Sequence, residues 1–217
     1  MIAEQGSVAL ADLDAVTVDA FGTLITLINP ITALRRALEE QGVDRSAVEV
    51  ESAFRAEVEY YVPRSHEGRD EATLALLRRD CAGVFLEAAD ADLPPEDFAE
   101  AFVASLRFAP LPGAVEACRA LHERGLRLAV VSNWDVGLAE HLEQLELLPL
   151  FDAVVTSAEA GAAKPDPRIF GLALRRLGAK PERTLHVGDS DADRDGARAA
   201  GLRFAEAPLA DVVRSLT

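Results

Sequence analysis

Five short apolar runs, rich in β-branched residues, constrain the fold of this chain more than any other feature. The runs are continuous rather than alternating, which is typical of strands covered on both faces. Segments with helical periodicity separate them, and this alternation predicts a parallel sheet in an α/β fold. The predicted strands are Ala15–Asp19, Leu126–Ser132, Ala153–Thr156, Thr184–Val187 and Leu202–Ala205, and the predicted helices around them are Gly113–Arg124, Val136–Leu147, Pro167–Leu177 and Asp195–Ala200.

A long segment between the first two strands breaks this rhythm. From about Asn29 to Arg107 the pattern is helical throughout, which is too long for an ordinary connection between a strand and a helix. The sequence therefore predicts a three-layer, Rossmann-like α/β core of residues 1–28 and 108–217, an inserted all-helical cap of residues 29–107, and a ligand site in the cleft between them. The predicted cap helices are Ile31–Gln41, Ala47–Tyr61, Glu71–Ala89 and Pro95–Ser105.

The balance of charges narrows the range of partners. The 217 residues include 22 Lys+Arg and 37 Asp+Glu, which gives a formal net charge of −15. Such a surface repels phosphate backbones and anionic lipids, so we expect no nucleic-acid partner and no membrane binding. If the substrate is itself a small anion, a local group must offset this field, and a divalent cation is the obvious candidate.

The cysteines and the apolar runs indicate the compartment. Two cysteines, Cys81 and Cys118, are too few for a disulfide framework or a zinc cluster, and both lie among apolar neighbours, so we expect buried thiols. The N-terminus has no basic region ahead of an apolar one, and no apolar run reaches the ~18–20 residues of a membrane span. We therefore expect a soluble cytoplasmic protein, either a monomer or a homodimer.

Polar side chains follow each of the first four predicted strands. Reactive groups of doubly wound sheets lie at the carboxyl ends of the strands, so we expect these side chains to meet. Each one has a structural alternative, since aspartates and serines also cap helices and close turns. Together they combine hard oxygen ligands for Mg²⁺ with a lysine and hydroxyls for an anion. They are Asp19 and Thr23, then Ser132 and Asn133, then Lys164, then Asp189 and Asp193.

Four segments in a fixed order carry a resemblance to a known family. They are VTVDAFGTL, VVSNWD, the lysine of AKPDPRIF, and HVGDSDAD. In these segments the chain resembles the haloacid dehalogenase-like (HAD) superfamily of hydrolases, in the subgroup with a helical cap between the first two motifs. The resemblance covers Val16 to Gly201, and the flanking phrases PLPGA and GARAAG are similar to the phosphatase-like branch.

The resemblance implies a role for each catalytic position. Asp19 would be the nucleophile and form a covalent aspartyl intermediate. Thr23 would hold an oxygen of the transferred group or orient Asp19. Ser132 and the backbone of Asn133 would bind phosphoryl oxygens. Lys164 would neutralise the charge that develops on the nucleophile and the phosphate.

The resemblance also implies a Mg²⁺ site. Asp19, Asp189 and the main-chain carbonyl of Phe21 would bind the ion. Asp193 would bind it through water or orient Lys164. The implied activity is that of a Mg²⁺-dependent phosphatase for a small phosphorylated metabolite.

One position departs from the phosphatase pattern. Phe21 stands where these phosphatases usually carry a second aspartate that transfers protons, a contribution typically worth ~10²–10⁴ in rate. The DAFGTL form resembles that of the 2-haloacid dehalogenases, which need no metal and expel halide without a proton. In that alternative Arg55 and Tyr60 or Tyr61 could bind carboxylate and halide, although Arg55 also fits a simple ion pair with Glu51 or Glu59.

The acidic fourth motif argues against the dehalogenase alternative, because aspartates gathered without a cation would repel one another. A third alternative is a catalytically weak binding member in which Phe21 has replaced the proton carrier. Two cap residues, His66 and Glu67, are conceivable proton donors, and Trp134 could form the floor of the cleft.

Overall fold

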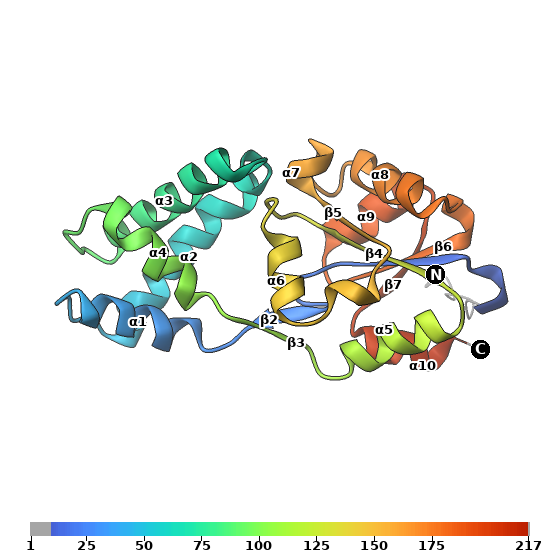
Figure 1. The fold of residues 1–217 in the computed structure, drawn as a ribbon, viewed down its shortest axis with the longest axis horizontal. Helices are drawn as coiled ribbons and strands as arrows, with labels where there is room; N and C mark the ends of the chain where they lie inside the picture. The colour runs from blue at the N-terminus through green and yellow to red at the C-terminus, as the bar shows by residue number, and fades with distance from the viewer. Residues whose placement is uncertain (1–9, 217) are drawn as a thin grey trace, which may run out of the picture.

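The computed structural model describes residues 10–216, and a five-stranded parallel sheet forms the middle of the part on the right in Figure 1. The sheet has the order β5-β4-β1-β6-β7, so the first strand is the middle one. This confirms the predicted fold class. Residues 1–9, on which the expectation about a signal peptide rests, lie outside the described part. The strands are β1 (Ala15–Val18), β4 (Arg127–Ser132), β5 (Ala153–Thr156), β6 (Thr184–Gly188) and β7 (Arg203–Glu206).

Helices cover both faces of the sheet and make three layers. Consecutive residues of β4 point to opposite faces, as strand geometry requires. Val130 therefore joins the core beneath α5 (Ala114–Glu123) and α10 (Leu209–Ser215). Val131 joins the core beneath α8 (Pro167–Leu177) and α9 (Asp191–Ala199). Two further helices, α6 (Leu138–Gln144) and α7 (Ser157–Ala160), follow β4 and β5.

Two helices have boundaries that differ from the prediction by two residues or more. Helix α9 begins at Asp191 rather than Asp195, because the side chain of Ser190 caps the backbone of Asp193 and the Asp193 side chain caps Ser190 in return. Helix α6 begins at Leu138 rather than Val136 and ends at Gln144 rather than Leu147. Glu146 adopts a left-handed backbone conformation with a φ of 57°, which a helix cannot continue through.

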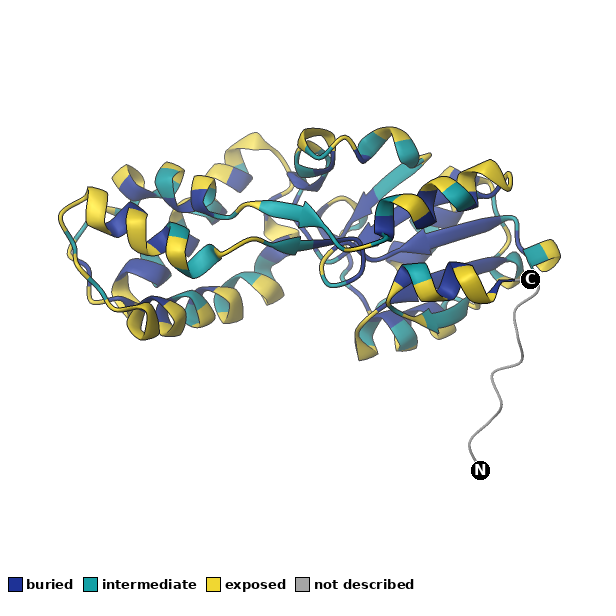
Figure 2. Cartoon of the chain, turned by 90° about the horizontal axis from the view of Figure 1, so that it is seen from below, coloured by how far each residue is buried: buried dark blue, intermediate teal, exposed yellow. Residues whose placement is uncertain are grey.

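The helical cap has a hydrophobic core of its own (Figure 2). The ring of Phe85 lies between those of Phe98 and Phe102, with centroid distances of 6.0 and 5.2 Å. A capping box of Ser46 and Glu49 starts the second helix. The cap consists of α1 (Pro30–Glu40), α2 (Ala47–Tyr61), the 3₁₀ helix η2 (Val62–Glu67), α3 (Glu71–Ala88) and α4 (Pro95–Ser105).

A small antiparallel ribbon joins the cap to the core, and the sequence did not predict it. Strand β2 (Ile25–Leu27) pairs with β3 (Phe108–Pro110), so the two chain crossings lie side by side. Each strand has three residues, shorter than the run of 4–8 residues that makes a strand visible in a sequence. The remaining 3₁₀ helices are η1 (Leu10–Asp12), η3 (Leu148–Leu150) and η4 (Pro181–Arg183).

Two expectations about burial can be compared with the described residues. Cys81 and Cys118 are both buried, unbridged thiols, as predicted, and burial raises the pKa of Cys118 to about 12. Over residues 10–216, every helix is too short or too polar to cross a lipid bilayer.

Candidate active site

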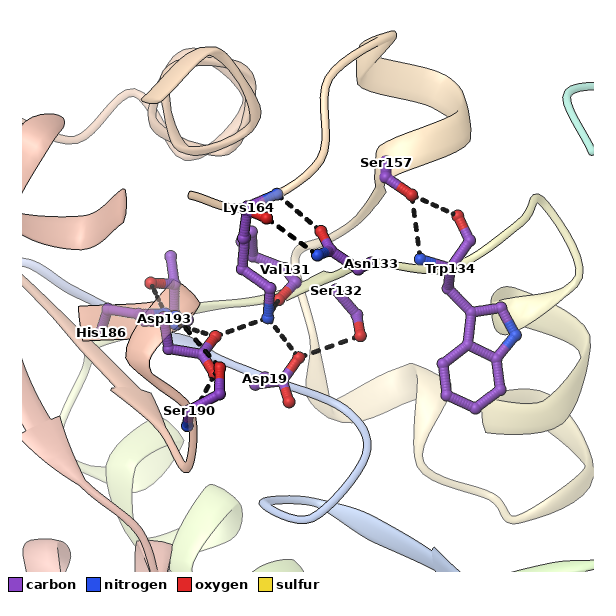
Figure 3. Close-up of polar contacts among 11 residues, drawn as sticks. Asp19, Val131, Ser132, Asn133, Trp134, Ser157, Lys164, His186, Ser190 and Asp193 are labelled. Carbon is purple, nitrogen blue, oxygen red and sulfur yellow. Dashed lines mark hydrogen bonds and ion pairs between the residues drawn. The ribbon is translucent and has the colours of Figure 1, made fainter. Parts of the chain in front are cut away.

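Four of the predicted side chains meet at the carboxyl edge of the sheet (Figure 3). The Nζ of Lys164 donates hydrogen bonds to Asp19 Oδ1 and to Asp193 Oδ1, each at 2.5 Å. It also donates to the main-chain oxygen of Val131 at 3.1 Å, and the Oγ of Ser132 donates to Asp19 Oδ1 at 2.9 Å. All four side chains are buried, so the sheet edge holds an ion-paired cluster shielded from water.

The side chain of Asn133 fixes the backbone of Lys164. Its Nδ2 donates to the Lys164 carbonyl at 3.0 Å, and its Oδ1 accepts from the Lys164 amide at 2.6 Å. Sequence reasoning assigned a role to the Asn133 backbone and did not foresee this contact of the side chain. The pair of bonds ties the loop before α8 to the end of β4.

Opposite charges keep the buried cluster ionised. Burial by itself would lower the pKa of Lys164, but the charges of Asp19 and Asp193 outweigh it and raise that pKa above its usual value. Burial would likewise raise the pKa of Asp193, but a hydrogen bond from His186 and the charge of Lys164 hold it well below its usual range. At neutral pH the lysine is therefore a cation between carboxylates.

His186, a buried histidine behind the cluster, was not among the predicted site residues. His186 Nε2 lies 3.0 Å from Asp193 Oδ1, and its Nδ1 lies 2.9 Å from Thr17 Oγ1. Burial lowers the pKa of His186, and an ionised carboxylate only accepts hydrogen bonds, so Nε2 donates to Asp193 and Nδ1 accepts from Thr17. The available signal was the polar pair itself, since Thr17 and His186 face each other on two otherwise apolar strands.

Thr23 lies buried after the turn that follows β1. Its hydroxyl is the one buried side-chain polar atom in residues 10–216 without a hydrogen-bond partner. Buried polar groups are nearly always satisfied, so this hydroxyl fits the predicted contact with an oxygen of a bound group.

Three carboxylates lie close enough to share one cation. Asp19, Asp189 and Asp193 each offer a ligand oxygen, and these oxygens lie within 4.8 Å of one another. Partial burial and the charges of Asp19 and Asp193 raise the pKa of Asp189. Such mutual repulsion is what a hard divalent cation relieves, so the donor set fits Mg²⁺.

The hydrogen bonds divide these carboxylates by role. Both oxygens of Asp193 already accept bonds from the protein, Oδ1 from Lys164 and His186 and Oδ2 from Ser190. Within residues 10–216, the hydrogen bonds to Asp19 all end on Oδ1, which leaves Oδ2 open. Both Asp193 oxygens are therefore occupied by protein donors, whereas Asp19 Oδ2 has no such donor among the described residues.

Gly22 is required where the first loop passes beneath Asp189. Its φ is +83°, and a Cβ atom there would lie 2.1 Å from Asp189 Oδ2. We expect Gly22→Ala to lower the free energy of unfolding by about 1–3 kcal/mol through strain and to weaken Mg²⁺ binding about tenfold, because Asp189 must move. Urea unfolding and calorimetric titration with Mg²⁺ measure the two effects.

Gly42→Ala is the matched control for Gly22→Ala. Gly42 has a φ of +80° but nothing within 4 Å of its would-be Cβ, so its substitution introduces backbone strain without a clash. Equal Mg²⁺ affinity in the two variants would contradict the assigned position of Asp189.

A cavity of about 200 Å³ lies between the cap and the core, beside the cluster. On the core side it is lined by Phe21, Asn133 and Trp134. Trp134 is buried and packs against Phe108 at a centroid distance of 5.3 Å, so it forms part of the cavity wall. Phe21 is 46% exposed and points into this space, while the predicted metal contact of its main-chain oxygen stays a prediction.

The cap residues considered for substrate binding lie in different places. Arg55 is exposed and pairs with Glu51 at 3.8 Å, as its structural alternative predicted. Tyr60 is covered by the guanidinium of Arg64, 4.1 Å from its ring centroid. Tyr61 does line the cavity, and its hydroxyl donates to Asp135 Oδ2 at 2.8 Å. The two conceivable proton donors, His66 and Glu67, are exposed on η2.

Comparisons with known proteins agree with this geometry. A phosphoglycolate phosphatase of Cereibacter sphaeroides is 32% identical over 196 residues, which cover 89% of this chain and 84% of that protein. The haloacid dehalogenase-like hydrolase domain-containing protein 3 of Bos taurus is 48% identical over 93 residues. That match covers 42% of this chain and 37% of the bovine protein, so the chain spans less than half of that relative.

A solved structure extends the likeness to the fold. The L-2-haloacid dehalogenase of Xanthobacter autotrophicus superposes with a TM-score of 0.65 at 24% identity, over 89% of this chain and 77% of that one. The family model for haloacid dehalogenase-like hydrolases matches residues 13–201. Because this match covers most of the chain, the chain belongs to the haloacid dehalogenase-like hydrolases.

Proposed function

We propose that this hydrolase is a Mg²⁺-dependent phosphatase that acts on a small phosphorylated molecule through an aspartyl phosphate on Asp19. The observation that carries the proposal is the bridge of Lys164 between Asp19 and Asp193, with the Asp189 carboxylate beside it. In this proposal residues 1–28 and 108–217 form the core, and residues 29–107 form the cap that covers the substrate.

The chain's own residues account for most of the proposed chemistry. Asp19 Oδ2 attacks phosphorus while Lys164 and Ser132 hold Oδ1 and orient the carboxylate. The unpartnered hydroxyl of Thr23 and the backbone of Asn133 would bind phosphoryl oxygens. Mg²⁺, held by Asp19, Asp189 and the Phe21 carbonyl, would supply positive charge for the phosphoryl oxygens. The leaving group would extend into the cavity beneath the cap.

Named relatives support the phosphatase assignment. Besides the phosphoglycolate phosphatase, a glyceraldehyde 3-phosphate phosphatase of Methanopyrus kandleri is 40% identical over 126 residues, which cover 55% of this chain and 54% of that protein. Both names describe small phosphorylated substrates, which suits a cavity of about 200 Å³.

A dehalogenase is the second candidate, because Phe21 and the aromatic wall of the cavity suit a reaction without a proton carrier. The acidic group of Asp19, Asp189 and Asp193 favours the phosphatase, since without a metal these three carboxylates have the single charge of Lys164 to balance them.

An assay pair separates the two candidates. We expect phosphate release from small phosphomonoesters in the presence of Mg²⁺, its loss with EDTA and its return with excess Mg²⁺. Halide release from 2-chloropropionate that is indifferent to EDTA would instead establish the dehalogenase. No activity in either assay would favour the third alternative, a catalytically weak binding member. Asp19→Asn is the negative control in each assay.

A further inference from the structure

The cavity beneath the cap is shaped for a ring. Six aromatic side chains line it, three from the core side and three from the cap side. A buried cavity of ~150 Å³ with apolar walls is known to take benzene, so about 200 Å³ holds one six-membered ring with a small substituent. The six are Phe21, Phe108 and Trp134, and Phe54, Tyr61 and Phe102.

The charges in the cavity also suit an uncharged group. Arg78 is the one permanent cation among the described residues that line it, and Asp135 lines it too. Burial raises the pKa of Glu57 to about 7, so that carboxyl is partly neutral near physiological pH and can share a hydrogen bond with a ring substituent. Burial lowers the pKa of His141, which is therefore neutral there. A leaving group that carried a further phosphate would have Arg78 as its one permanent cation among these lining residues.

Phe21, the cavity-lining residue nearest to Asp19 in the sequence, has no proton to donate. Phe21 follows Asp19 by two residues, and its ring lines the cavity where the leaving group would emerge. Glu57 belongs to α2, is buried, and lines the cavity from the cap side. Phe21 cannot protonate a leaving oxygen beside it, and this favours a weakly basic leaving group. A phenol has a pKa of about 10, whereas water, and with it an aliphatic alcohol, lies near 16.

We propose that the preferred substrates are aryl phosphates, monoesters of a phenol-type hydroxyl whose ring occupies the cavity between Phe21 and α2. This rests on the proposed phosphatase activity and names the substrate class for it. The aromatic walls would bind the ring, and the missing proton donor at Phe21 would exclude alkyl esters of the same shape.

The proposed step balances without a protein acid. Asp19 Oδ2 forms a bond to phosphorus, the bond from phosphorus to the phenolic oxygen breaks, and the aryloxide leaves with that electron pair. Water outside the site protonates the aryloxide and leaves hydroxide. A second water then attacks the phosphorus of the aspartyl phosphate, which returns the Asp19 carboxylate and hydrogen phosphate, and its released proton neutralises the hydroxide.

Val58→Phe tests the proposed ring site without creating a new cavity, because it replaces a small side chain with a larger one. Val58 lines the cavity from α2 and is 38% exposed, so a larger side chain there can fill the cavity without disturbing the core of the cap. Val48→Phe is the matched control, because Val48 is 75% exposed on the same helix and is not part of the cavity lining. Equal melting temperatures of the two variants and the parent chain would establish that the fold is intact.

Three substrates separate ring shape from leaving-group basicity: phenyl, cyclohexyl and acetyl phosphate, each with Mg²⁺. We expect kcat for phenyl phosphate to exceed that for cyclohexyl phosphate at least 100-fold. Val58→Phe should raise KM for both ring substrates roughly tenfold or more, the effect of losing a buried ring, and leave acetyl phosphate within twofold. Equal rates for the two rings, or an equal effect of Val58→Phe on all three substrates, would overturn the proposal while the phosphatase activity stands.

A binding measurement keeps the proposal testable if no phosphate is hydrolysed. Calorimetry with the Mg²⁺-loaded chain should give at least tenfold tighter binding of phenylphosphonate than of methylphosphonate, and Val58→Phe but not Val48→Phe should remove the difference. That preference without turnover would overturn the proposed function and support the ring site. Equal affinities would overturn the ring site whatever the turnover.

Discussion

Replacing Asp19 with asparagine is expected to lower kcat by roughly 10⁴- to 10⁶-fold, the range seen when a catalytic nucleophile or its essential partner is removed. An amide has the shape of the carboxylate but is a poor nucleophile. Asp193 still pairs with Lys164 in the variant, so the buried lysine keeps a counter-charge and the fold should persist. Phosphate affinity should therefore change much less than turnover.

The covalent step gives a second readout for Asp19. Acid quenching during turnover should trap a phosphoryl group on the peptide that contains Asp19, and mass spectrometry would detect it in the parent chain but not in Asp19→Asn. Asp191→Asn is the control, since Asp191 is exposed and pairs with Arg194 at 2.7 Å. Phosphate on another residue, or a kcat of Asp19→Asn within 100-fold of the parent, would show that Asp19 is not the nucleophile.

Local sequence signals were sufficient for most of the core and the cap. Helix α8 begins and ends as predicted because Asp166 caps its first turn, Pro167 opens it and Gly178 closes it in the left-handed region. The inner strands were visible because they are mainly apolar runs buried between two layers of helices, as β1 and β4 show. The two domain boundaries stay a prediction.

The features that the sequence did not reveal depend on partners distant in the chain. The ribbon of β2 and β3 exists only because residues about 80 positions apart lie side by side. In the sequence His186 looks like any other residue of a buried strand, and only the register of β1 and β6 shows that Thr17 lies opposite it. The Asn133 side chain holds the Lys164 backbone across 31 positions. Such contacts carry no local periodicity.

The position of the candidate site followed from a general rule, whereas its charge balance did not. Parallel strands bring their carboxyl ends to one edge, which was enough to gather Asp19, Ser132 and Asp193 there. The depth of burial of Lys164 could not be inferred from a lysine that precedes a proline. The catalytic and metal roles assigned to these residues stay predictions until the variants are measured.

The burial of Lys164 makes the largest stability prediction. Lys164→Met would leave Asp19 and Asp193 buried without their shared cation, and breaking a buried ion pair by removing one partner costs about 3–5 kcal/mol. We expect a loss of that size in the free energy of unfolding at pH 7, measured in urea. Lys180→Met is the matched control, because Lys180 is exposed and its replacement should have little effect.

The free energy of unfolding should depend on pH with opposite signs in the parent chain and in Lys164→Met. In the parent chain the pKa of Asp193 is held below its unfolded value near 3.9, so its stabilisation is present above about pH 4 and is lost as the pH falls further. In Lys164→Met the burial of Asp193 acts without the cation and raises the pKa of that carboxyl. The folded variant is then penalised while Asp193 is ionised, and the penalty falls as acid protonates it.

The difference in unfolding free energy between the parent and Lys164→Met should therefore be largest near pH 7 and shrink towards pH 4. Millimolar Mg²⁺ should stabilise the variant more than the parent, because an added cation relieves a repulsion that the parent already balances with its lysine. Urea titrations at pH 7, 5.5 and 4, with and without Mg²⁺, measure both effects. If the difference in unfolding free energy were constant from pH 7 to pH 4, Lys164 would stabilise the fold by packing of its side chain. The ion-paired cluster would then not be the centre of the site.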